Sequence, residues 1–211
     1  MKWIDKVDIK DKAYFQGLIV MSEHASVNQV EKIVRAGLRA AAEKGWAALS
    51  FTDIADEAGV SLSDLRLVIS EKLDLLDRFA QIVDRRVLDD VHHLYAPNDS
   101  VRDKLFSILM GRFDVLQDDR AGVCAVLRDV LKDPCDAITS LPHIIKSMRW
   151  MAESAGMRLS GIKGAGVLIA LSGLYIWVLR TWVQDESSDM STTMAALDHR
   201  LSQAQRWGLI D

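Results

Sequence analysis

Apolar residues recur at helical spacing along almost the whole chain, and no segment shows the strict alternation of a half-buried strand. Val30, Ile33, Val34 and Ala41, for example, share one face of a first long helix. Capping and turn residues divide the remainder into further helices. The pattern therefore predicts an all-α protein of about nine helices. After the first helix they are expected to cover residues 51–58, 62–69, 72–91, 100–116, 121–132, 142–155, 164–183 and 191–207.

Two short helices joined by a tight turn are predicted between residues 50 and 72. Ser50 and Asp53 have the capping-box spacing, in which a hydroxyl caps the amide three residues on and a carboxylate reaches back. The first helix should therefore start at Phe51. Gly59 can adopt the left-handed conformation that ends it.

The second short helix has its own start signal only two residues later. Ser61 and Asp64 repeat the capping arrangement, so this helix is expected to run from Leu62 to Ile69. Two capped helices around a glycine turn form a helix-turn-helix.

Prolines and a glycine set the expected limits of a later helix. Pro134 should interrupt the chain, Pro142 is well placed in the first turn of a helix running to about Ala155, and Gly156 should end that helix.

Composition indicates a folded protein without a global attraction to nucleic acid. The chain has 211 residues, 49% of them hydrophobic, and a formal net charge of −4. Residues 29–79 carry nine acidic and seven basic side chains. Any contact with DNA must therefore be local, and nonspecific binding should be weak.

The chemistry of an enzyme is missing from the sequence. It contains no glycine-rich phosphate loop, nucleophile elbow or metalloprotease motif, so we expect no enzyme, no cofactor and no metal site. Cys124 and Cys135 lack metal-ligand spacing and are interpreted as reduced thiols, as expected for a cytoplasmic protein.

The uncharged run from Gly164 to Leu179 is 16 residues long, whereas a membrane span needs about 20. We interpret it as a buried helix that faces no water on any side, and expect no integral membrane segment. It either forms a dimer interface or is a purely internal core helix.

The amino-terminal third of the chain resembles the TetR family of bacterial repressors. The resemblance rests on Glu43-Lys44-Gly45-Trp46, Asp53-Ile54-Ala55, Ala58-Gly59-Val60-Ser61, and Lys72 with Leu75 and Leu76. It weakens between Leu62 and Ser70, where this chain has Arg66 and Ile69 in place of the family's usual aromatic residues.

This resemblance implies a TetR-like fold with a DNA-binding domain over residues 26–72 and an effector-binding and dimerisation domain over residues 73–211. Residues 1–25 are expected to be a poorly ordered extension, because Met21-Ser22-Glu23 looks like a protein start; an ordered amphipathic arm is the alternative.

The implied function is a homodimeric transcriptional regulator that binds a DNA operator and is controlled by a small hydrophobic effector or lipid. Arg66 is the best candidate for reading a base, because its guanidinium group can donate hydrogen bonds to two atoms of one guanine. For the serines, plain helix capping is an equally good interpretation. The candidate DNA-contact residues are Ser50, Thr52, Ser61, Leu62, Ser63, Arg66, Leu67 and Lys72.

Two further sets of residues are candidates in the second domain, although Met and Trp at helical spacing are often simply core. The candidate effector pocket comprises Met110, Phe113, Met148, Met151 and Trp177, with Arg112, His143 or Arg149 as polar anchor. The candidate dimer interface comprises Gly166, Ser172, Gly173, Trp177, Met194, Leu197 and Leu201.

A second resemblance supports an alternative function. Residues 101–207 are similar to the carboxy-terminal domain of the lipid-binding accessory proteins of ubiquinone biosynthesis, through the uncharged helix, the tryptophans and Leu197-Asp198-x-Arg200. Those proteins have a TetR-like fold but bind isoprenoid lipid and a partner enzyme instead of DNA. Exposed Leu62 and Leu67 would suit that function better than a phosphate contact.

Overall fold

Helices make up nearly all of the chain in the computed structural model, which describes the backbone of residues 9–130, 132 and 134–210 and the side chains of 27–130, 132 and 137–210. The described part contains no strand, as the periodicity predicts. The helices are α1 (Ile9–Lys44), α2 (Phe51–Ala58), α3 (Leu62–Val68), α4 (Lys72–Asp89), α5 (Val91–Leu94), α6 (Val101–Gln117), α7 (Arg120–Val130), α8 (Pro134–Ser154), α9 (Gly161–Gln184) and α10 (Ser191–Arg206).

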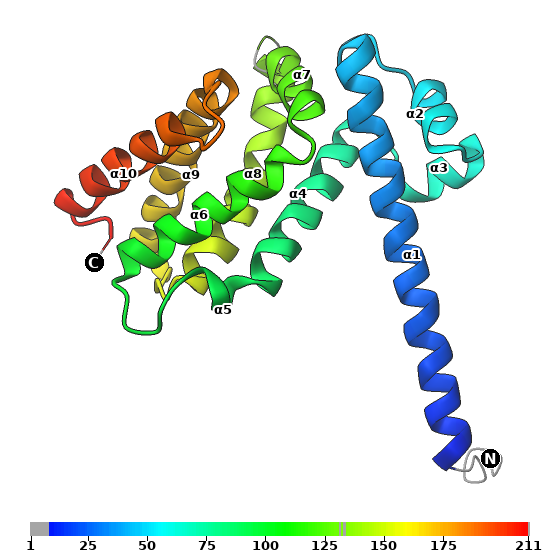
Figure 1. The fold of residues 1–211 in the computed structure, drawn as a ribbon, viewed down its shortest axis with the longest axis horizontal. Coiled ribbons are helices and arrows are strands. Elements are labelled where there is room, and N and C mark those ends of the chain that lie inside the picture. The colour runs from blue at the N-terminus through cyan, green and yellow to red at the C-terminus, as the bar shows by residue number, and fades with distance from the viewer. Residues whose placement is uncertain (1–8, 131, 133, 211) are drawn as a thin grey trace.

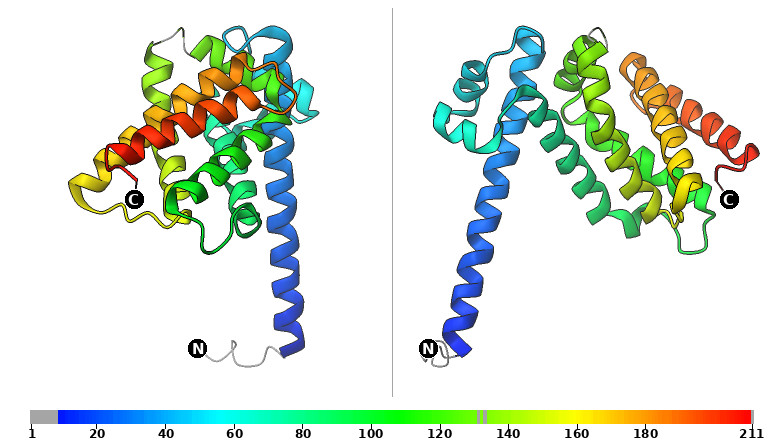
Figure 2. Two further views of the ribbon diagram at one scale, coloured as in Figure 1. Left: turned by 60° about the vertical axis from the view of Figure 1, so that its left-hand side comes forward. Right: turned by 180° about the vertical axis from the view of Figure 1, so that it is seen from behind.

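Helix α1 stands between two parts of the molecule. The small pair α2 and α3 packs on one side of its carboxy-terminal half, and the body of α4 to α10 lies on the other (Figure 1). The amino-terminal half of α1 projects away from both parts, as the two views of Figure 2 also show. The α2–α3 pair is thus attached to the body mainly through the packing of α2 on α1 and through the chain that continues from α3 into α4.

The predicted helix-turn-helix is confirmed in its details. The backbone amide of Asp53 donates to Ser50 Oγ at 3.2 Å, and the Ser50 amide donates to Asp53 Oδ2 at 2.9 Å, which completes the capping box. Gly59 ends α2 in the left-handed conformation with φ of 63°. Ser61 caps α3 by accepting from the Asp64 amide at 3.1 Å.

The first helix begins earlier than its apolar face predicts. Where poor order was expected up to residue 25, the backbone is helical from Ile9 onward, and residues 1–8 lie outside the described part. No proline interrupts residues 9–44, so a helix anchored by packing at one end can propagate backward without a break. The domain boundary at residue 25 stays a prediction.

The prediction for Pro142 was wrong, but Pro134 does separate two helices, since α7 ends at Val130 and α8 begins at Pro134. Helix α8 runs from Pro134 to Ser154 with Pro142 inside it. Pro134 opens this helix, because the first turn needs no amide from its first residue. Pro142 is tolerated although it cannot donate to the carbonyl four residues back. Gly156 ends the segment with φ of 94°, as predicted.

The remaining helices follow the expected order. Ser100 caps α6 by accepting from the Asp103 amide at 3.1 Å. The predicted helix over residues 72–91 ends at Asp89 and is followed by the short α5. Helices α9 and α10 cover the last two predicted segments and pack against each other.

Candidate nucleic-acid interface and ligand cavity

The outer surface of α3 is exposed to solvent, while Leu65 and Ile69 anchor the helix in the core. Leu62 is 52% exposed and Leu67 is 85% exposed. Arg66 is also exposed, and its Nη1 donates to Ser70 Oγ at 2.6 Å. The structure thus presents an arginine between two leucines on an outward-facing helix.

The candidate phosphate-binding hydroxyls at the start of α2 and α3 are all exposed, but three of them already have partners. Ser50 Oγ donates to Asp53 Oδ2 at 2.6 Å, and Ser61 Oγ donates to Asp64 Oδ2 at 2.7 Å. Ser63 Oγ lies 2.7 Å from Ser61 Oγ. Capping is therefore the observed role of Ser50 and Ser61.

Lys72 lies apart from the α3 surface and has a structural role. Its Nζ donates to the carbonyl oxygens of Trp46 at 2.9 Å and Ala47 at 3.3 Å, and it lies 5.3 Å from the centre of the Trp46 ring. The lysine therefore ties the start of α4 to the loop after α1. A contact with phosphate would compete with these bonds.

Acidic side chains neutralise much of the positive charge near α2. Asp53 pairs with Lys44, and this contact together with Ser50 holds the pKa of Asp53 well below its usual range. Arg39 Nε pairs with Glu57 at 2.8 Å. Because Lys44 and Arg39 are both paired with carboxylates, neither adds an unpaired positive charge beside the exposed face of α3.

The candidate effector residues do not form a pocket together. Met110, Phe113, Met148 and Met151 lie in the packed core, whereas Trp177 is 42% exposed on α9, with the Arg200 guanidinium of α10 3.8 Å from the centre of its ring. Helical spacing identified these four as inward-facing, but it does not distinguish a side chain in the solid core from one at a cavity wall.

A large cavity lies beside this core and has a volume of about 350 Å³. Its wall comes from α4, α6, α7, α8 and α9, and Leu38 contributes from α1. Most lining residues are aliphatic. Two of the three expected polar anchors, Arg112 and His143, do lie at its wall. Arg149 lies elsewhere and pairs with Glu153 at 3.4 Å.

A buried polar network forms one part of the cavity wall. Arg112 donates from Nε to the hydroxyl oxygen of Tyr175 at 2.9 Å and from Nη1 to Asp84, and Ser147 Oγ donates to Asp84 Oδ2 at 2.6 Å. Burial alone would lower the pKa of Arg112, but Tyr175 and Asp84 outweigh it and raise this pKa. Arg112 therefore stays charged and is neutralised by Asp84.

A second pair lies at a more open part of the wall, where His143 Nδ1 is 2.6 Å from Asp77 Oδ1. The pair joins α8 to α4. Arg112 and His143 are thus both tied to acidic residues of α4, the helix that leads directly from the helix-turn-helix into the body. Arg180 of α9 also lies at the wall and is exposed to solvent.

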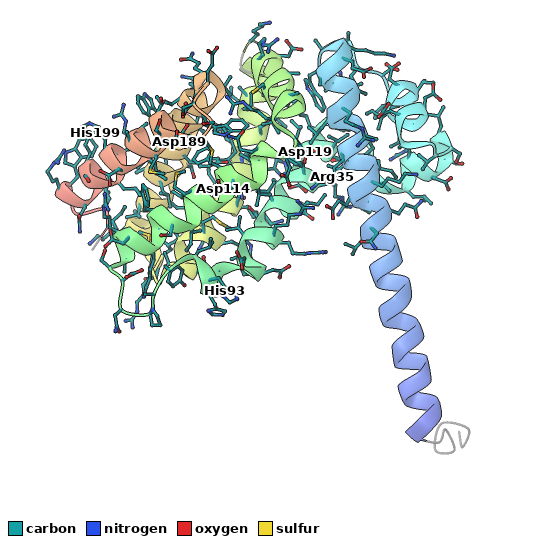
Figure 3. All side chains as sticks on the ribbon, viewed as in Figure 1. Arg35, His93, Asp114, Asp119, Asp189 and His199 are labelled. Atoms are coloured by element: carbon teal, nitrogen blue, oxygen red, sulfur yellow. The ribbon has the colours of Figure 1, made fainter. Side chains whose placement is uncertain are left out.

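Close packing couples α1 to α7. A Cβ atom on Gly122 would lie 2.4 Å from the Leu38 carbonyl oxygen, so the two backbones approach as only glycine permits. Nearby, Arg35 of α1 lies 3.3 Å from Asp119, which follows α6 (Figure 3). Ala47 donates from its amide to Asp129 Oδ2 at 3.0 Å, which attaches the loop after α1 to α7 as well.

The candidate dimer residues fall into two groups. Gly166, Gly173, Trp177 and Met194 are exposed on α9 and α10, whereas Ser172, Leu197 and Leu201 lie in the core of the protomer itself. These three cannot offer surface to a second copy. Sequence reasoning missed two exposed residues of the same α9 face, Ile162 and Ile169.

Helix α9 is therefore not shielded from water on all sides, contrary to expectation. Within the described residues it is the one helix long and apolar enough to cross a membrane, with a mean hydropathy of 1.8, but length and composition fit a core helix equally. Its inner face carries Tyr175 and Trp182, which stack or pack against Phe113 in the core.

The arrangement of helices is that of the TetR-family transcriptional regulators. The chain is similar to a TetR transcriptional regulator from Nitrosomonas europaea ATCC 19718, with 24% identity, 84% of this chain and 98% of that chain covered, and a TM-score of 0.66. It is also similar to a TetR transcriptional regulator from Rhodococcus sp. RHA1, with 15% identity, coverage of 83% and 94%, and a TM-score of 0.61. No family model and no curated protein matches the sequence. At these identities, the likeness establishes a TetR-like fold.

Proposed function

We propose that the protein is a dimeric DNA-binding transcriptional regulator whose effector occupies the cavity between α4, α7, α8 and α9. The observation that carries this proposal is the outward presentation of α3 by two capped helices that stand clear of the body (Figure 1). A short helix of this kind can enter the major groove with its first residues against base edges.

Arg66 is the proposed base reader of α3. Its guanidinium is exposed and held only by the hydroxyl of Ser70 on the same face, so it can turn toward guanine without breaking a buried contact. Leu62 and Leu67 would contact thymine methyl groups on either side. Ser63 and Thr52 supply exposed hydroxyls for phosphate oxygens.

The cavity is well placed to influence the position of α3. Leu38 of α1 and Leu73 in the first turn of α4 both lie at its wall, so an effector would contact the two helices that hold the helix-turn-helix. An effector that alters their spacing changes the separation of two α3 helices in a dimer, and so the affinity for DNA.

The test is binding of the purified protein to DNA from upstream of its own gene, measured by fluorescence anisotropy at several salt concentrations. Arg66→Ala should lose about tenfold or more of the preference for this DNA over a scrambled duplex, since a bidentate contact contributes about 1–3 kcal/mol of discrimination. Arg85→Ala is the matched control, because Arg85 is also exposed but lies on α4 and pairs with Asp89.

Thermal stability of the Arg66→Ala protein should match that of the wild type. Retention of full selectivity by this variant would contradict the proposed reading helix, and absence of any salt-sensitive DNA binding by the wild type would contradict the function itself.

A lipid-binding accessory function is the second candidate, and the exposed leucines of α3 favour it. Leu62 and Leu67 flank a surface on which Asp64 offsets the charge of Arg66, which suits a protein or lipid contact better than a phosphate backbone. Native mass spectrometry of the freshly purified protein distinguishes the two functions. A co-purified isoprenoid together with no DNA retention would establish the accessory function.

A further inference from the structure

Tyr175 has a hydrogen-bond donor that the described residues leave unused. Its side chain is only 4% exposed and lies at the wall of the large cavity. The hydroxyl oxygen accepts from Arg112 Nε at 2.9 Å. A phenol can accept and donate at once, yet no described residue accepts a hydrogen bond from this hydroxyl.

The other polar groups beside Tyr175 are engaged with each other. Ser147 donates to Asp84, and Arg112 uses Nε and Nη1 for Tyr175 and Asp84. A buried donor without an acceptor costs free energy, so an acceptor atom brought by a ligand would be favoured at this point of the wall.

The charges of the wall determine the kind of acceptor. Arg112 is buried and already neutralised by Asp84, and His143 is paired with Asp77. Arg180, the third basic side chain at the wall, is exposed to solvent, where water screens its charge. A ligand carboxylate placed beside Tyr175 would leave one net negative charge in an aliphatic cavity, which is costly. A carbonyl, ether or hydroxyl oxygen accepts the same hydrogen bond without adding charge.

We propose that the cavity binds an uncharged, mainly hydrocarbon molecule with an oxygen acceptor, which receives a hydrogen bond from the Tyr175 hydroxyl. The proposal rests on the proposed role of this cavity as the effector site. The aliphatic residues of α4, α7 and α9 surround the hydrocarbon part, and the Arg112–Tyr175 contact polarises the phenol and strengthens its donation.

The test compares ligands of equal chain length. The uncharged fluorescent probe N-phenyl-1-naphthylamine is bound to the full chain and then displaced with 2-dodecanone, dodecane or ionised dodecanoate. The ketone should displace the probe at a concentration roughly fivefold lower than the alkane does, as one net hydrogen bond predicts. Of the two polar ligands, dodecanoate should need the higher concentration to displace the probe.

Two variants and one control locate the effect. Tyr175→Phe should remove the advantage of the ketone over the alkane while leaving alkane displacement nearly unchanged. Tyr95→Phe is the matched control, because Tyr95 donates to the Ser154 carbonyl at 2.8 Å and is not among the residues at the cavity wall. Ala80→Trp fills the cavity from α4 and should abolish displacement by all three ligands.

Several results would overturn the inference. Equal displacement by ketone and alkane, tighter binding of dodecanoate than of ketone, or an unchanged ketone advantage in a folded Tyr175→Phe protein each contradict it. If the Tyr175→Phe protein fails to fold, the order in which the ketone, the alkane and the carboxylate displace the probe from the wild type still tests the inference. Failure of the proposed function would appear separately, as absence of DNA binding with the ligand ranking intact.

Discussion

Asp185 organises the turn between α9 and α10 through both of its carboxylate oxygens. Oδ1 accepts from the Ser187 amide at 3.0 Å, and Oδ2 accepts from the amide and hydroxyl of Thr193, each at 2.7 Å. Burial raises the pKa of Asp185, but the hydrogen bonds from Ser187 and Thr193 favour the ionised form more strongly and hold the pKa well below the ordinary 3.8.

This carboxylate should make stability depend on pH in the acid range. Because its folded pKa lies below the unfolded value, its contribution is complete above pH 3.8 and is lost as the pH falls toward the folded pKa. Asp185→Asn should lower the free energy of unfolding by about 2 kcal/mol at neutral pH. Urea denaturation at neutral and acid pH checks this, since the gap between wild type and variant should narrow on acidification. A gap that does not change with pH would contradict the assignment.

At the scale of elements, the packing of α1 on α7 depends on Gly122. Gly122→Ala would place a Cβ 2.4 Å from the backbone oxygen of Leu38, so the two helices must separate. We expect a net loss of about 1–2 kcal/mol of stability, the packing strain exceeding the gain in helix propensity. Gly111→Ala is the control, because the new Cβ would meet only methyl groups of Leu94 at 3.1 Å, which can rotate away.

Thermal and urea unfolding of both variants tests this packing. A Gly122→Ala protein as stable as the wild type would show that α1 and α7 can separate freely. Because α1 also holds α2 and α3, the same variant should weaken binding to DNA relative to Gly111→Ala.

Element boundaries could be predicted from sequence wherever a local rule decides them. Ser50, Gly59 and Ser61 fix the ends of α2 and α3 by contacts within a few residues, and these predictions hold. The start of α8 could not be predicted in this way. Pro142 looks like a helix start, but the tertiary packing of α8 against α4 and α9 outweighs the loss of one backbone hydrogen bond.

The site was less predictable than the fold, because periodicity reports which side chains face inward and not what lies between them. Met148 and Tyr175 are both inward-facing, yet only Tyr175 lies at the wall of the large cavity. In the same way, Ser172 and Gly173 are neighbours in sequence, but only the glycine is exposed on the outer face of α9. Such distinctions depend on how several helices meet.

At the scale of the whole molecule, the described residues include an exposed apolar surface along α9, which α10 covers in part where the Arg200 guanidinium lies 3.8 Å from the centre of the Trp177 ring. Ile162, 95% exposed, and Ile169, 63% exposed, follow this face with Gly166, Gly173 and Trp177 at helical spacing. Glycines flatten the face so that a second backbone can approach, and Trp177 adds contact area. This surface is where we expect the proposed dimer to form, by a two-fold contact with a second copy.

A charge in the middle of this surface should separate the copies. We expect Ile169→Lys to convert a dimer to a monomer in sedimentation velocity, because each two-fold contact would bury two uncompensated ammonium groups. Ile138→Lys is the control, since Ile138 is similarly exposed but lies on α8. A monomer reads one half-site instead of two sites about 34 Å apart, so Ile169→Lys should also lose most operator affinity while α3 itself is unchanged. A wild-type monomer, or a dimer that survives Ile169→Lys, would show that this face serves another partner.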